Sequence, residues 1–127
     1  MTCVQPAVGD RERRVDYVEF ASCDLGQSRA FFEQVFGWQF QDYGPQYTAF
    51  DDGRLQGGFF LGQPLLASAG APLLVIYQQR LEQALARVQA HGGQISKAIF
   101  SFPGGSRFHF IEPGGNELAV WSEADAA

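Results

Sequence analysis

The sequence predicts an α+β fold made of two copies of one β-α-β-β-β module. Residues 15–61 contain a strand-like stretch, an amphipathic helix and three more strand-like stretches, and residues 72–123 repeat that order. The helix of each copy ends in glycine, at Gly37 and at Gly93. Recurrence of the same elements with the same turn signals is the mark of an internal repeat.

The first module begins with a β-strand at residues 15–22, VDYVEFAS. Its helix, CDLGQSRAFFEQVFGW, has Asp24 as the predicted N-cap, Gln27 as the capping-box partner and Gly37 as a left-handed stop. One largely apolar face of this helix comprises Leu25, Ser28, Phe32, Val35 and Phe36. Three strands are predicted near residues 38–43, 46–51 and 55–61, with turns rich in Gly, Pro and Asp between them.

The second module begins with a strand at residues 72–77, PLLVIY, and its helix is RLEQALARVQAHGG. The remaining strands are predicted near residues 94–101, 106–111 and 117–122, separated by PGG and PGGN turns. Residues 62–71 are expected to link the modules, and residues 1–14 to form an N-terminal tail.

Each predicted helix can cover one face of a short, mostly antiparallel sheet. The opposite face of the sheet then needs another partner. Two such sheets joined edge to edge, with the helices outside, would form a cup-shaped surface. Concave surfaces of this kind commonly hold small molecules.

Composition narrows the function classes. The formal charge is −5, and the only basic cluster, Arg11, Arg13 and Arg14, falls in the predicted tail. A nucleic-acid partner is therefore not expected, because phosphate-binding surfaces need clustered Lys and Arg. No apolar run approaches the roughly 20 residues of a membrane span. The first residues lack an apolar signal-peptide core, so a cytoplasmic protein is expected.

Two segments resemble a known superfamily. VDYVEFASCDLGQSRAFFEQVFGW at residues 15–38 looks like the opening motif of the vicinal oxygen chelate superfamily, and FHFIEPGGNELAVW at residues 108–121 looks like its closing motif. Glu112 stands where that closing motif usually has Asp. Members include glyoxalase I, bleomycin-resistance and fosfomycin-resistance proteins and extradiol dioxygenases. The whole-chain pattern, over residues 15–123, is most similar to small bacterial glyoxalase-related proteins.

The resemblance implies paired βαβββ modules, a cup and usually a divalent metal bound by His, Gln or Glu. It places the four ligands at Tyr17, near Gly57 within about one residue, at Leu73 and at Ala119. One phenol and three side chains without donors cannot complete a metal shell. No metal cofactor is therefore expected, unless the ligands lie elsewhere. Members this small usually pair, so a homodimer is also expected.

Strand alternation predicts which other side chains line the cup. Glu19 should share the face of Tyr17, Phe59 that of Gly57, and Val75 and Tyr77 that of Leu73. Glu117 and Trp121 should share the face of Ala119. The predicted ligand-binding set is Tyr17, Glu19, Phe59, Val75, Tyr77, Glu117 and Trp121.

Two functions follow from this lining. The first is a metal-free binding protein for a small hydrophobic or aromatic molecule, similar in kind to bleomycin-resistance proteins. The alternative is a lyase or isomerase related to lactoylglutathione lyase, either metal-free or using a metal held by other residues. In the metal-free case a buried Glu19 would be the catalytic base, because desolvation raises the pKa of a carboxyl, and Tyr17 would donate a hydrogen bond. Each of these residues also has a structural interpretation: Glu19 can lie at the rim of the cup, Glu117 can be solvated at a strand end, and His109 can be structural. The chain can also be an interaction domain that binds no small ligand.

Overall fold

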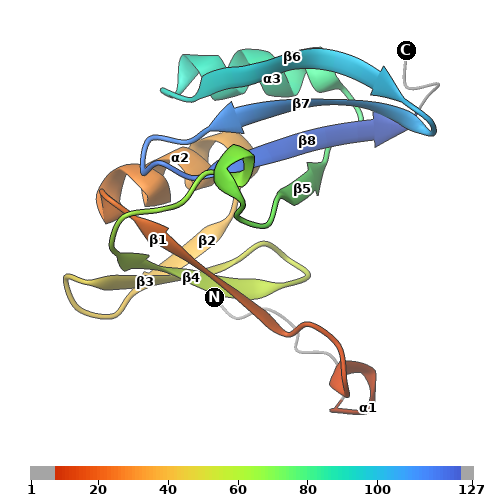
Figure 1. The fold of residues 1–127 in the computed structure, drawn as a ribbon. Helices are drawn as coiled ribbons and strands as arrows, with labels where there is room; N and C mark the ends of the chain where they lie inside the picture. The colour runs from red at the N-terminus through yellow and green to blue at the C-terminus, as the bar shows by residue number, and fades with distance from the viewer. Residues whose placement is uncertain (1–7, 124–127) are drawn as a thin grey trace.

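The two predicted modules are present. The computed structural model describes residues 8–123, which form two four-stranded sheets and two main helices (Figure 1). The first module holds β1 (Tyr17–Ser22), α2 (Leu25–Phe36), β2 (Gln39–Asp42), β3 (Tyr47–Asp51) and β4 (Gln56–Leu61). The second holds β5 (Leu74–Tyr77), α3 (Leu81–Ala90), β6 (Gln94–Phe102), β7 (Gly105–Ile111) and β8 (Glu117–Glu123).

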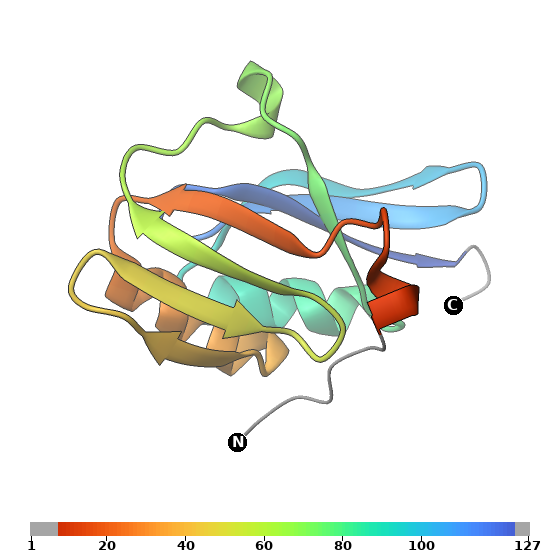
Figure 2. The ribbon, with the colours of Figure 1, turned by 90° about the horizontal axis from the view of Figure 1, so that it is seen from below.

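Both sheets have the same topology. Their strand orders are β1-β4-β3-β2 and β5-β8-β7-β6, and in each only the first pair is parallel. Within residues 8–123 no hydrogen-bonded strand pair joins one sheet to the other. The helices α2 and α3 lie side by side (Figure 2). The mostly antiparallel sheets are confirmed, whereas their union into one cup stays a prediction.

The segments outside the modules are short. The predicted tail contains the one-turn helix α1 (Val8–Arg11). Arg11 forms a salt bridge with Asp16 at 3.0 Å. Residues 1–7 of the tail lie outside the described part of the chain. The linker contains the 3₁₀ turn η1 (Ala67–Ala69). Among residues 8–123 no helix is both long and apolar enough to span a bilayer.

The N-cap Asp24 and the stop at Gly37 form as the sequence predicts, whereas the return bond of a capping box does not: the Asp24 N–H donates to the Ser22 hydroxyl at 3.1 Å. The Gln27 backbone N–H donates to Asp24 Oδ1 at 3.1 Å, and the Gln27 side-chain amide donates to Asp24 Oδ2 at 3.0 Å. Gly37 adopts φ 75°, a left-handed conformation that glycine enters without steric cost. These local signals fix where the helix begins and ends.

One aromatic core serves both modules. Phe32 on α2 stacks against Trp38 with ring centroids 4.5 Å apart and against Phe59 at 5.5 Å, so it covers the first sheet. Phe31, one residue earlier, meets Phe110 of the second sheet at 5.7 Å. Because α2 packs on both sheets, the modules share a single hydrophobic core rather than two separate ones.

The β7–β8 turn is tied to the start of α2 by a buried carboxylate. Glu112 is 1% exposed, and its Oε1 accepts from the Ser28 hydroxyl at 2.8 Å and from the Gly114 N–H at 2.7 Å. Its Oε2 accepts from the Asn116 side-chain amide at 2.8 Å, and that amide also donates to the carbonyl of Ala21. The turn of one module is thereby fastened to the first strand and helix of the other.

Replacing Glu112 with Ala should lower the free energy of unfolding by about 3 kcal/mol, because several buried donors lose their acceptor at once. Urea denaturation monitored by circular dichroism measures the change. Glu82→Ala is the matched control, since Glu82 lies exposed on α3, and it should change stability by less than about 0.5 kcal/mol. Equal stabilities of the two variants would show that the carboxylate does not fasten the modules together.

Candidate functional site

Each sheet has one face against the helices and one open face. On β1, Val18 and Phe20 pack against the core, so the alternate side chains point away from it. The first open face consists of Tyr17, Glu19, Tyr47, Gly58 and Phe60. The second open face consists of Val75, Tyr77, Lys97, Phe100, Arg107, His109, Glu117, Ala119 and Trp121.

A hydrogen-bonded chain of two phenols and a carboxylate occupies the first open face. The Tyr47 hydroxyl donates to Glu19 Oε2 at 3.0 Å and also bonds to the Tyr17 hydroxyl. Burial, followed by the hydrogen bonds to Tyr17 and Glu19, raises the pKa of Tyr47 above its ordinary value. Sequence reasoning placed Tyr17 and Glu19 together but missed Tyr47, which comes from a neighbouring strand.

Glu19 does not have the burial on which a role as catalytic base depends. Its side chain is exposed in the chain, and Tyr47 donates a hydrogen bond to its carboxylate. The Tyr17 hydroxyl is likewise engaged with Tyr47. In the single chain, Tyr17, Glu19 and Tyr47 therefore form a polar cluster on the open face of the sheet. They do not form an acid–base pair removed from water.

The placement of Phe59 is a correction to the sequence prediction. Phe59 is fully buried and stacks on Phe20 at 5.1 Å, so it lies in the core and not on the face of Tyr17. The parallel pairing of β1 and β4 explains the difference, because it sets Glu19 opposite Gly58 and Phe20 opposite Phe59. A shift of one residue moves a strand's side chains to the other face.

The second open face carries four of the predicted ligand-binding residues, and three of them, Val75, Tyr77 and Trp121, lie close together. Val75 and Tyr77 lie beside Ala119 and Trp121 in the β5–β8 register, and the Tyr77 and Trp121 rings meet edge to face at 5.4 Å. The Tyr77 hydroxyl donates to Glu123. This hydrogen bond raises the pKa of Tyr77 and lowers the pKa of Glu123.

Glu117 has a structural role in this arrangement. Its carboxylate accepts from the Ser68 N–H at 3.1 Å and from the Ser96 hydroxyl at 2.8 Å. Burial raises the pKa of Glu117, but these hydrogen bonds outweigh it, so the pKa lies below its ordinary value. Glu117 thereby holds the linker against the second sheet instead of standing free at a strand end.

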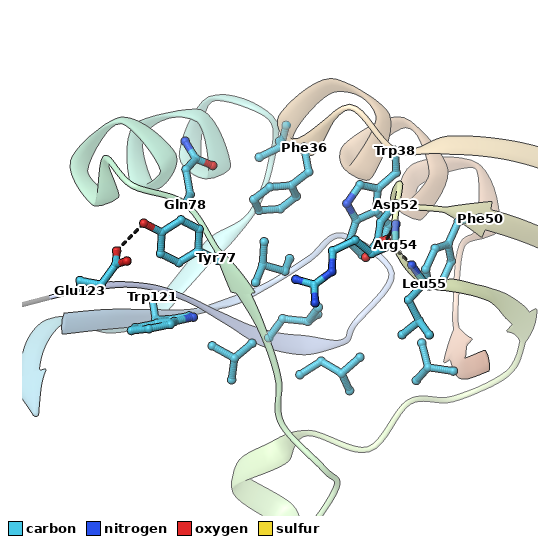
Figure 3. A pocket seen from close by; sticks show the side chains of 16 residues that line it. Phe36, Trp38, Phe50, Asp52, Arg54, Leu55, Tyr77, Gln78, Trp121 and Glu123 are labelled. Carbon is cyan, nitrogen blue, oxygen red and sulfur yellow. Dashed lines mark hydrogen bonds between the residues drawn. The ribbon is translucent and has the colours of Figure 1, made fainter. Parts of the chain in front are cut away.

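A cavity of about 770 Å³ lies along the edge strand β5, between the modules (Figure 3). Trp38, Phe50 and Leu55 line its first-module side, and Val75, Tyr77 and Trp121 extend onto the second open face. The remaining lining residues are Val18, Val35, Phe36, Asp52, Arg54, Leu74, Ile76, Gln78, Leu118 and Glu123. Of the predicted set, Tyr17, Glu19, Phe59 and Glu117 do not line this cavity.

The donor set at the expected metal positions does not suit a divalent ion. Tyr17 and Ala119 occupy two of these positions. Near the third, the register of β1 and β4 turns Gly57 toward the core and leaves Gln56, opposite Tyr17, and Gly58, opposite Glu19, on the open face. Leu73, at the fourth, offers no side-chain donor. Within residues 8–123 no group of three His, Cys, Asp or Glu side chains gathers closely enough to bind a metal ion.

Comparison with protein families accounts for this architecture. The model of the glyoxalase/bleomycin resistance protein/dioxygenase superfamily matches residues 14–120. The chain belongs to this superfamily. None of the curated proteins compared with it matches.

Solved structures of superfamily members share the fold at low sequence identity. A glyoxalase-related enzyme from Fulvimarina pelagi has a TM-score of 0.72 at 19% identity, with 87% of this chain and 88% of that chain covered. A lactoylglutathione lyase from Agrobacterium tumefaciens gives 0.67 at 19%, covering 87% and 93%. The fosfomycin resistance protein FosX from Listeria monocytogenes, in complex with Mn(II) and dihydroxypropylphosphonic acid, gives 0.73 at 14%, covering 88% and 90%.

Substitution of Gly58 with Ala should lower the pKa of Tyr47 toward its ordinary value. The added Cβ would lie 2.0 Å from the Tyr47 hydroxyl and 2.9 Å from that of Tyr17, so the two rings must separate and their hydrogen bonds break. Because the folded chain keeps this phenol protonated, the stabilisation it contributes is present below about pH 10 and is lost as the pH rises further. Ultraviolet titration of tyrosinate measures the shift.

Gly26→Ala is the control for this titration. Its Cβ would lie 3.7 Å from Asp24 Oδ1, an ordinary contact, so the Tyr47 titration should be unchanged. A Gly58→Ala protein that titrates like the unsubstituted protein would refute the hydrogen-bonded phenol pair.

Proposed function

We propose that this superfamily member binds a small planar aromatic or hydrophobic molecule, without a metal, in the cavity along β5 and over the adjoining second open face. The observation that supports this most is the cavity itself. Its volume of about 770 Å³ falls within the roughly 300–1,000 Å³ typical of small-molecule sites.

The lining favours an aromatic ligand. Trp121 lies on the second-module side of the cavity, and Tyr77 lies edge to face against it (Figure 3). Trp38, on the other side of β5, is 9% exposed and stacks on Phe32 and Phe50, so Trp121 and Tyr77 are the rings open to a ligand. Offset and edge-to-face contacts with such rings stabilise a bound aromatic group beyond the burial of its area. Arg54 and Gln78 supply polar groups among the apolar walls, as expected for a site that orients its ligand.

Metal-free binding is part of the proposal. At the four positions expected for ligands, Tyr17, Gly58, Leu73 and Ala119 offer one phenol and no carboxylate, imidazole or amide, and the neighbouring Gln56 would add only one amide. A site built this way relies on shape, apolar burial and hydrogen bonds. These four positions therefore lack the side chains that would bind the metal ion used by other members of the superfamily.

We propose further that two copies of the chain pair through their open faces. Large apolar side chains stand on both of them: Phe60 is 42% exposed, Tyr17 44%, Val75 43% and Tyr77 49%. Val75 and Tyr77 share one face of β5, and exposed apolar side chains gathered on a sheet face usually mark a contact surface. Pairing would bury them and would enclose a ligand lying over Trp121.

Fluorine NMR of protein labelled with 5-fluorotryptophan tests ligand binding directly. The chain has only two tryptophans, Trp38 and Trp121, and both line the cavity. Titration with 2-naphthoate or neutral 2-naphthamide should shift both resonances along one saturating curve. EDTA or added Zn²⁺, Ni²⁺ or Mn²⁺ should leave that curve unchanged.

Leu55→Phe should weaken binding of both probes by about tenfold, or 1.4 kcal/mol, because the larger ring fills part of the cavity. Leu65→Phe is the matched control, since Leu65 lies exposed in the linker outside the cavity. Failure of both probes to shift either resonance, or equal affinity of the two variants, would contradict binding in this cavity.

Sedimentation equilibrium tests the pairing. The protein should behave as a species of about twice the chain mass of 14.0 kDa. Phe60→Glu should shift it toward the single chain, because a carboxylate in an apolar contact is costly. Ala86→Glu, at an exposed position on the helix α3, should not. A protein that sediments as a single chain at all concentrations would refute the dimer.

A further inference from the structure

Three basic side chains surround one aromatic ring on the second open face. Lys97 Nζ lies 5.4 Å from the centroid of the Phe100 ring, and the Arg107 guanidinium carbon lies 5.4 Å from the same centroid. The His109 ring is 5.8 Å from Phe100. In a chain of net charge −5, such a local concentration of basic groups needs an explanation.

In the described part of the chain, neither long cationic side chain of the cluster is in direct contact with an acid. Within residues 8–123 neither Lys97 nor Arg107 forms an ion pair. Glu117, whose charge acts on His109, is already hydrogen-bonded to Ser68 and Ser96. Glu117 keeps its negative charge, so the cluster of Lys97 and Arg107 with this one acid carries a net positive charge.

Two buried nitrogens in the cluster lack partners in the described chain. His109 is only 7% exposed, and its Nε2 makes no hydrogen bond; the Nε of Arg107 is also buried without a partner. Burial, then Arg107 and Lys97, lower the pKa of His109, so its imidazole is neutral at pH 7. The charge of the cluster is carried by the two long side chains, with neutral imidazole beneath them.

The cluster adjoins the aromatic wall of the proposed ligand site. Arg107 stands opposite Trp121 in the β7–β8 register. Its guanidinium carbon lies 5.5 Å from the Phe102 ring centroid, and the Phe102 ring lies 6.4 Å from that of Trp121. A planar ligand over Trp121 would thus have its edge beside Arg107.

We infer that the ligand is an aromatic carboxylate, with its ring over Trp121 and its carboxylate bound by Arg107 and Lys97. This inference rests on the proposed function and names the chemical class of its ligand. Guanidinium recognises a planar carboxylate through two parallel hydrogen bonds, whereas an ammonium acts as a point charge beside it. The rings of Phe100 and Phe102 hold the Arg107 guanidinium in place before the ligand arrives.

Arg54 is the competing anion-binding residue. It lines the cavity and projects into it, and it forms no ion pair within residues 8–123 (Figure 3). It comes from the exposed turn before β4, however, where no aromatic ring stacks on its guanidinium. Binding of the ligand through Arg107 and binding through Arg54 therefore predict different effects of substituting each arginine.

The test compares 2-naphthoate with 2-naphthamide by fluorine NMR titration at low salt. The two probes share the naphthalene ring, and the first carries an anionic carboxylate where the second carries a neutral amide. The unsubstituted protein should bind naphthoate at least about tenfold more tightly, a difference of 1.4 kcal/mol. Arg107→Gln and Lys97→Gln should each reduce this ratio severalfold, and 0.5 M salt should reduce it as well. Arg107→Lys should restore part of it.

Arg80→Gln is the control: it removes the same charge at an exposed position at the start of α3, outside the cavity, and should retain the ratio. Arg54→Gln tests the competing residue and should reduce the ratio less than Arg107→Gln does. Lys97 is exposed, so Lys97→Gln tests the proposal even if Arg107→Gln disturbs packing. Equal binding of both probes, or loss of the ratio in Arg54→Gln instead, would overturn the carboxylate assignment and leave the aromatic site standing. Binding of neither probe would overturn both.

Discussion

The buried carboxylate of Glu112 is the interaction on which the arrangement of the two modules depends. It receives hydrogen bonds from its own turn and from Ser28 on α2, so the closing turn of the second module is fastened to the opening helix of the first. Buried charge is tolerated only with such complete hydrogen bonding. With this end fixed, α2 can place Phe31 on one sheet and Phe32 on the other, and a single aromatic core results.

Because the shared core covers only the helix side of each sheet, both sheets keep an open face. The candidate functional residues lie on these two faces. On the first, Gly58 provides the space in which the Tyr17 and Tyr47 hydroxyls meet. On the second, the small Ala119 lies among Val75, His109 and Trp121. Small residues thus stand at two places where the superfamily resemblance puts metal ligands. Gly58 has two tyrosines and the Glu19 carboxylate beside it, whereas Ala119 has aromatic side chains and His109. Only the second open face therefore suits an organic anion.

The sequence predicts the elements well because their signals are local. Asp24, Gln27 and Gly37 define α2 by themselves, and the repeat of elements defines the modules. Phe59 was misplaced because the register of a parallel strand pair depends on contacts made only after folding. Tyr47 and Arg54 were missed for a similar reason: one comes from a neighbouring strand and the other from a turn, and nothing in the nearby sequence links either to the site.

A crystal structure of the protein with 2-naphthoate would test the central claim most directly. The account predicts the naphthalene ring over Trp121, between Tyr77 and the first-module wall of the cavity, with its carboxylate hydrogen-bonded to Arg107 and near Lys97. A second copy should cover the open face that holds it. A naphthoate bound through Arg54 alone would contradict the assignment of its carboxylate. A cavity that stays closed to saturating naphthoate would contradict the aromatic site itself.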